Sequence, residues 1–86
     1  MNREGGKVAE RRVYLSFFGE ALTRPLIWEM GHKHKVVTNI RNASIKNDMG
    51  LVALGLEGEQ QEIDRALEWI AAQGVKVEPI EKNVIE

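Results

Sequence analysis

Alternating apolar and polar positions predict four β-strands in this chain. In the first stretch, residues 12–18, apolar side chains recur at Val13, Leu15 and Phe17. This two-residue period is typical of a strand with one buried face. Further stretches with strand patterns or β-branched residues follow at residues 36–45, 51–57 and 75–80.

Two segments between these strands have helical patterns. Residues 59–74 place apolar side chains at i, i+3, i+4 and i+7, and Gly74 stands where a left-handed C-terminal cap belongs. Residues 23–33 form a second, shorter candidate. Thr23 can cap its first turn, and Pro25 is tolerated there because the first N–H groups of a helix have no helical partner.

The predicted order of elements is β-α-β-β-α-β. Such an order favours an α+β, ferredoxin-like fold, in which a four-stranded antiparallel sheet carries both helices on one face. We expect one domain at residues 12–80, with flexible tails at residues 1–11 and 81–86. Met1 and the short tails favour a complete chain over an excised domain.

A fold of this kind leaves one sheet face bare, and period-two counting predicts what lies there. Asn39 and Arg41 would form a polar centre, with Ala43 further along the same strand, whereas Ile40 would face the core. The apolar and small residues expected around that centre are Tyr14, Phe18, Ile45, Leu51, Ala53 and Gly55. A patch of this kind usually marks a contact surface.

Asn39 and Arg41 each allow two interpretations. Asparagine is disfavoured in strands, so Asn39 either satisfies local backbone groups or binds a ligand through its amide. Arg41 is either a solvated charge or a partner for a carboxylate, which guanidinium binds in bidentate fashion.

Composition removes several classes of function. The formal net charge is −1, so bulk electrostatics do not favour nucleic acid or anionic membranes. There is no cysteine, and His32 and His34 have no further histidine to complete a site, so we expect no metal and no cofactor. No apolar run approaches the roughly 20 residues needed to cross a bilayer, and we expect a cytoplasmic location.

Sequence motifs of the common enzyme classes are also absent. We find no phosphate-binding loop ending in Gly-Lys-Ser/Thr, no Gly-x-Ser-x-Gly and no His-Glu-x-x-His. The chain is therefore expected to be non-enzymatic. Tyr14 and Phe18 could stack on RNA bases, but basic residues are not concentrated near them, so RNA binding is kept only as a third alternative.

Three stretches, KVVTNIRNASI at residues 35–45, GLVALGLEG at residues 50–58 and ALEWIAAQGVKVEPI at residues 66–80, together resemble the NIL domain family. The family takes its name from an Asn-Ile-Leu motif, of which Asn39 and Ile40 match two positions. The resemblance implies an ACT-like, ferredoxin-like fold. In bacterial methionine importers such domains pair and bind methionine at their interface.

Carried onto this chain, the resemblance implies that Asn39 and Ile45 contact a ligand. Arg41 replaces the apolar third motif residue, where it either holds a carboxylate or fills the site. We therefore expect a stand-alone, homodimeric regulatory domain that senses a small amino acid such as methionine. The alternative is an assembly module that binds a protein partner and no ligand.

Overall fold

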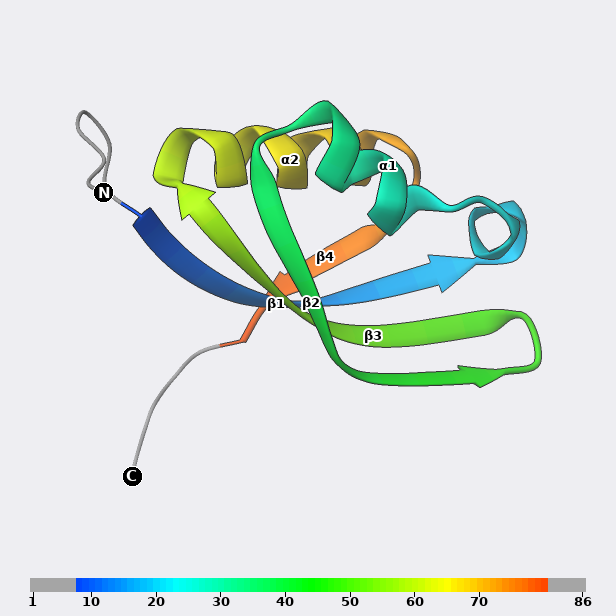
Figure 1. Cartoon of the computed structure of the whole chain (residues 1–86). Coiled ribbons are helices and arrows are strands. Elements are labelled where there is room, and N and C mark those ends of the chain that lie inside the picture. The colour runs from blue at the N-terminus through cyan, green and yellow to red at the C-terminus, as the bar shows by residue number, and fades with distance from the viewer. Residues whose placement is uncertain (1–7, 81–86) are drawn as a thin grey trace, which may run out of the picture.

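The four strands form one antiparallel sheet in the order β2-β3-β1-β4. The structure, a computed structural model, describes residues 8–80. The strands are β1 Val8–Phe18, β2 Val36–Lys46, β3 Met49–Glu59 and β4 Lys76–Pro79. The helices are the 3-10 helix η1 Gly19–Thr23 and the α-helices α1 Leu26–Lys33 and α2 Gln60–Ala72. Figure 1 shows α1 and α2 on the same side of the sheet, which confirms the predicted ferredoxin-like arrangement.

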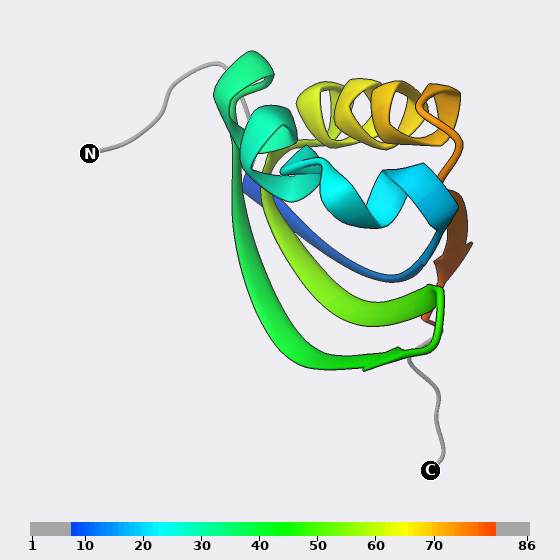
Figure 2. The ribbon, with the colours of Figure 1, turned by 90° about the vertical axis from the view of Figure 1, so that its right-hand side faces the viewer.

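Most of the core residues that the sheet provides lie on one face of β1 and β3, its two interior strands. The sheet curls around the helices, which lie on its concave side (Figure 2). Side chains alternate along a strand, so burying one face leaves the other to solvent. The buried apolar residues are Val13, Leu15, Phe17, Leu26, Met30, Val36, Val52, Leu54, Leu56, Ile63, Ala66, Ile70 and Val75.

Strand β1 begins earlier than the sequence pattern predicts. Residues 8–11 were expected in the N-terminal tail but belong to β1, where Val8 pairs with Glu59 and Ala9 with Gly58. This part of β1 has charged residues at Glu10 and Arg11 and no clear alternation. It is a strand because the long β3 offers it a hydrogen-bonding partner, which only the tertiary fold supplies.

Thr23 does not cap α1 as expected. Its hydroxyl donates to the Glu20 carbonyl at 2.8 Å within η1, and α1 begins after Pro25. The ring of a proline disfavours a helical conformation in the preceding residue, and Arg24 is extended. The expected left-handed glycine after α2 is confirmed, since Gly74 has φ +95° and its N–H donates to the Ala71 carbonyl at 3.0 Å.

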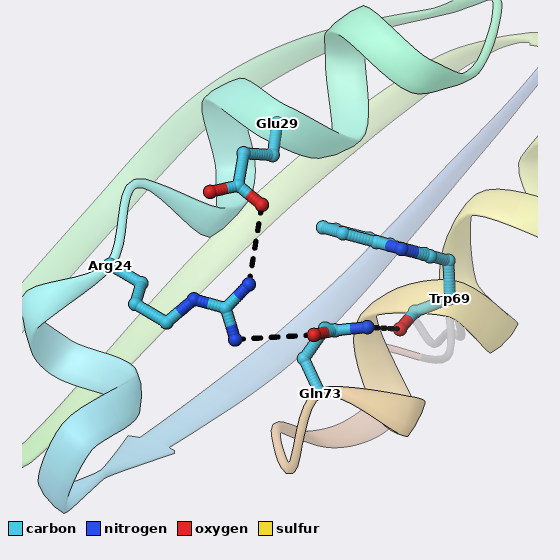
Figure 3. Close-up of polar contacts among 4 residues, drawn as sticks. All are labelled: Arg24, Glu29, Trp69 and Gln73. Carbon is cyan, nitrogen blue, oxygen red and sulfur yellow. Dashed lines mark hydrogen bonds and ion pairs between the residues drawn. The ribbon is translucent and has the colours of Figure 1, made fainter.

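A small polar network joins the start of α1 to the end of α2 (Figure 3). The Arg24 guanidinium donates to Gln73 Oε1 at 3.2 Å and to Glu29 Oε1 at 3.4 Å. Gln73 Nε2 in turn donates to the Trp69 carbonyl at 3.4 Å. The Arg24–Glu29 ion pair lies at the surface and contributes about 0–1 kcal/mol to the stability of the fold.

Glu62 of α2 provides a second link, to the segment that enters β2. Its Oε1 accepts a hydrogen bond from the Lys35 backbone N–H at 3.0 Å, and its Oε2 pairs with Arg65 at 3.2 Å. The Lys35 hydrogen bond lowers the pKa of Glu62 below its ordinary value, and the Arg65 charge acts in the same direction. Within residues 8–80, no helix is long and apolar enough to span a membrane.

Leu54 and Ile40 face each other across β2 and β3, and they offer a matched test of the core. Leu54 is fully buried, whereas Ile40 is 55% exposed. Leu54→Ala should lower the free energy of unfolding by about 2–5 kcal/mol because it leaves a cavity. Ile40→Ala removes as many carbon atoms from an exposed position and should lower the free energy of unfolding by no more than about 1 kcal/mol. Urea denaturation of both variants measures this, and equal losses would contradict the assignment of the core.

Replacing Glu62 with glutamine should destabilise the protein in a pH-dependent way. A carboxyl whose pKa is lowered by folding stabilises the folded state above its unfolded-state pKa. That contribution disappears as the pH falls through the lowered pKa. The melting temperature of Glu62→Gln should therefore lie below that of the wild type at neutral pH, and the two should converge in strong acid. A constant difference at all pH values would contradict the role of the charge.

Candidate functional site

A β-bulge at Arg41 interrupts the pairing of β2 with β3. Ile40 lies opposite Leu54 and Asn42 lies opposite Ala53, so Arg41 is the additional residue. A bulge of one residue reverses which face the following side chains point to, relative to simple alternation. Every face assignment in β2 beyond Arg41 therefore differs from the period-two count.

Ile45 consequently lies on the helix-facing side of the sheet, so its predicted place on the open face is wrong. It pairs with Gly50, and a Cβ on Gly50 would lie 3.5 Å from Ile45 Cγ1 and 2.8 Å from Leu22 Cδ2. Ala43 moves to the same side, opposite the buried Val52. Ile45 is nevertheless 69% exposed, since it belongs to an edge strand.

Asn39 and Arg41 lie together on the face away from the helices, which we call the open face. Asn39, Gly55 and Arg12 are in register across β2, β3 and β1. A Cβ on Gly55 would lie 3.9 Å from Arg41 Cδ, so the arginine stem passes over this glycine. The open-face hollow at this point is about 280 Å³, and it is lined by Glu10, Val37, Thr38, Asn39, Arg41, Gly55 and Glu57.

Gly55 is the floor of the open-face hollow. It is buried although it has no side chain, and its φ is not in the left-handed region, so the backbone itself does not require glycine there. An added Cβ would meet only ordinary contacts, at 3.8 Å from the Asn39 carbonyl and 3.9 Å from Arg41. The absence of a side chain leaves this part of the hollow open, and neither the backbone conformation nor a close contact requires glycine there.

Two carboxylates at the edge of the hollow were not predicted as site residues. Glu10 and Glu57 are directly opposite each other in β1 and β3, and Val37 completes their row. Among the ion pairs of residues 8–80, none within 4.0 Å involves Glu10, Glu57, Arg12 or Arg41. Glu10 lies beside the hollow because β1 begins before the predicted strand and pairs with β3 there.

The remaining residues expected on the open face lie along its other end. Tyr14, Phe18 and Leu51 are exposed, and Ala53 is half-buried between its strand neighbours. Ser16 lies among them and is buried, opposite Leu51 on one side and Lys76 on the other. We call Tyr14, Phe18, Leu51 and Ala53 the apolar strip.

A second hollow, of about 200 Å³, opens on the helix side near η1 and α1. Its walls are mainly apolar and include Leu22, Leu26 and Val52, with Trp28 at the surface. No candidate residue from the sequence lines it. His32 lies nearby, and its Nδ1 is 2.9 Å from the Trp28 carbonyl. The residues that the structure describes contain no group of three potential metal ligands among His, Asp and Glu.

A comparison with known protein families identifies the family of the chain. Residues 11–79 match the NIL domain family. Because the match covers most of the chain, the chain belongs to the NIL domain family, as the resemblance in β2 and β3 indicates.

Two known proteins, one curated relative and one solved structure, are similar to the chain. The methionine import ATP-binding protein MetN of Geobacillus kaustophilus (strain HTA426) is 39% identical over 70 residues, which cover 77% of this chain and 20% of that protein. The chain thus spans about a fifth of the length of this curated relative. The de novo designed protein Foldit4 superposes with a TM-score of 0.55 at 15% identity, covering 90% of this chain and 100% of that one. At such low identity this likeness concerns the fold alone.

Proposed function

We propose that this protein is a non-enzymatic regulatory domain that senses a small amino acid such as methionine. The observation that carries the proposal is Asn39, which lines the open-face hollow in register with Gly55. Family membership supports it, as does similarity to a protein named for methionine import. An amide both donates and accepts hydrogen bonds, so Asn39 can bind either end of an amino acid.

Arg41 leaves room for a ligand. Its stem lies against Gly55, yet the hollow beside it still measures about 280 Å³. That volume is just below the range of about 300–1,000 Å³ found for drug-sized ligands, and so suits a metabolite. Of the two roles considered for Arg41, binding a carboxylate therefore fits better than filling the site.

The proposed site is completed by a second copy of the chain. Burying a methionine side chain contributes about 1.5–3 kcal/mol, whereas even millimolar affinity requires about 4.1 kcal/mol. A shallow hollow on one protomer would therefore hold methionine weakly. Ile45 cannot touch a ligand held by Asn39 of the same protomer, because the bulge places them on opposite faces. In this proposal Ile45 of the second copy reaches the ligand.

The apolar strip favours a second candidate function, an assembly module. Tyr14, Phe18 and Leu51 are exposed side by side on the open face, as in a protein contact surface. Such a module would bind a protein partner through this strip and would show no response to amino acids. The strip also offers a surface for the homodimer. Because both the amino-acid sensor and the assembly module can use it, only a response to amino acids distinguishes the two functions.

Asn39→Ala should weaken methionine binding by about tenfold, since one or two hydrogen bonds of about 0.5–1.5 kcal/mol are lost. The matched control is Asn42→Ala, which removes the same group from the same strand outside the hollow. The measurement is the methionine-dependent rise in melting temperature, with sedimentation to follow the dimer. If the wild type does not respond to millimolar methionine, the assembly module is favoured.

Gly55→Val should block binding while preserving the fold. The new side chain would occupy the floor of the hollow, whereas the backbone at this position accepts any L-residue. Ala71→Val, at an exposed position of α2 on the other side of the sheet, is the control and should bind as the wild type does. Isothermal titration and far-UV circular dichroism together test this. A Gly55→Val variant that is folded and binds normally would place the ligand elsewhere.

A further inference from the structure

We propose that the open-face hollow recognises both charged ends of a free α-amino acid, with Arg41 binding the carboxylate and Glu10 and Glu57 binding the ammonium group. This inference rests on the proposed function and adds to it the residues that bind each charged group of the free amino acid. The two glutamates are the new residues in this assignment. A peptide-bonded or N-acylated amino acid would lack the ammonium group and would be rejected.

The carboxylate pair is the first argument. Glu10 and Glu57 are direct cross-strand neighbours, so their Cβ atoms lie about 4.5–5.5 Å apart. Two like charges in this position destabilise a sheet. An ammonium group has three donors and can be shared by two carboxylates, which removes the repulsion. The free protein therefore holds a pair of charges that a cationic group would stabilise.

The spacing along the strands is the second argument. Glu57 and Gly55 are two residues apart in β3, a distance of about 7 Å, and Arg41 lies over Gly55. The ammonium and carboxylate of an α-amino acid are attached to the same carbon atom. With a hydrogen bond of about 3 Å at each end, such a group spans the gap between the glutamate row and the guanidinium.

The charge balance is the third argument. Two carboxylates, Glu10 and Glu57, line the hollow together with Arg41, and a second arginine, Arg12, lies in register with Gly55. The sum is zero, which matches a zwitterion. A phosphate or a nucleic acid backbone would instead meet two negative charges beside the arginines, at a cost of like-charge repulsion.

The test compares three compounds on the 86-residue chain by isothermal titration. They are L-methionine, its des-amino analogue methylthiobutanoic acid and its decarboxylated analogue methylthiopropylamine. Methionine should bind at least about tenfold more tightly than either analogue, since each analogue leaves charged groups of the protein unpaired. The double variant Glu10→Gln/Glu57→Gln should lose about tenfold in affinity for methionine. Its affinity for the des-amino analogue should stay within about twofold of the wild type.

The control variant is Glu78→Gln, which removes a carboxylate from the open face outside the hollow and should bind methionine normally. If methionine binds but the double variant binds it equally well, the glutamates serve only the stability of the sheet. That result overturns this inference and leaves the proposed function intact. If none of the three compounds binds to the wild type, both the inference and the proposed function are wrong.

Discussion

The structure depends on burying one face of the two interior strands, β1 and β3, beneath α1 and α2. Leu15, Leu54 and Leu56 are entirely removed from solvent, and the helices add Met30 and Ile63 to the same core. A domain of this size has only one such core, so its stability is concentrated in it. The opposite face of the same strands makes little contribution to the core. It can therefore carry polar, charged and small residues without loss of the fold, and the candidate site lies there.

The bulge at Arg41 determines which side chains of β2 lie on the open face. One additional residue in β2 leaves Asn39 on the open face and turns Ala43 and Ile45 toward the helix side. The edge strand thus presents a polar group on one face and an exposed apolar group on the other. A protein chain that pairs along this edge, or folds over it, meets both. The separation of Asn39 from Ile45 is the reason that we assign them to different copies in the proposed dimer.

The open-face hollow also differs in composition from the surfaces that stabilise the fold. Opposed glutamates, an arginine lying over glycine and an asparagine in a strand each reduce the stability of a sheet slightly. Charged residues elsewhere make favourable contacts. Glu62, for example, accepts a backbone hydrogen bond and pairs with Arg65. Residues that lower the stability of the fold are expected to cluster at a functional site, because function and stability impose different requirements there.

The sequence by itself determined the order of elements, the fold class and the family, because periodicity depends only on the chain and one face of each element must be buried. It also placed Asn39, Tyr14 and Gly55 on the open face, since they precede the bulge or lie in regular strands. Arg41, the bulge residue, lies on that face over Gly55. The tertiary structure alone decided the early start of β1, the face of Ile45 and the meeting of Glu10 with Glu57. These features depend on strand register, and register is set by hydrogen bonds between segments distant in the chain, which local patterns do not contain.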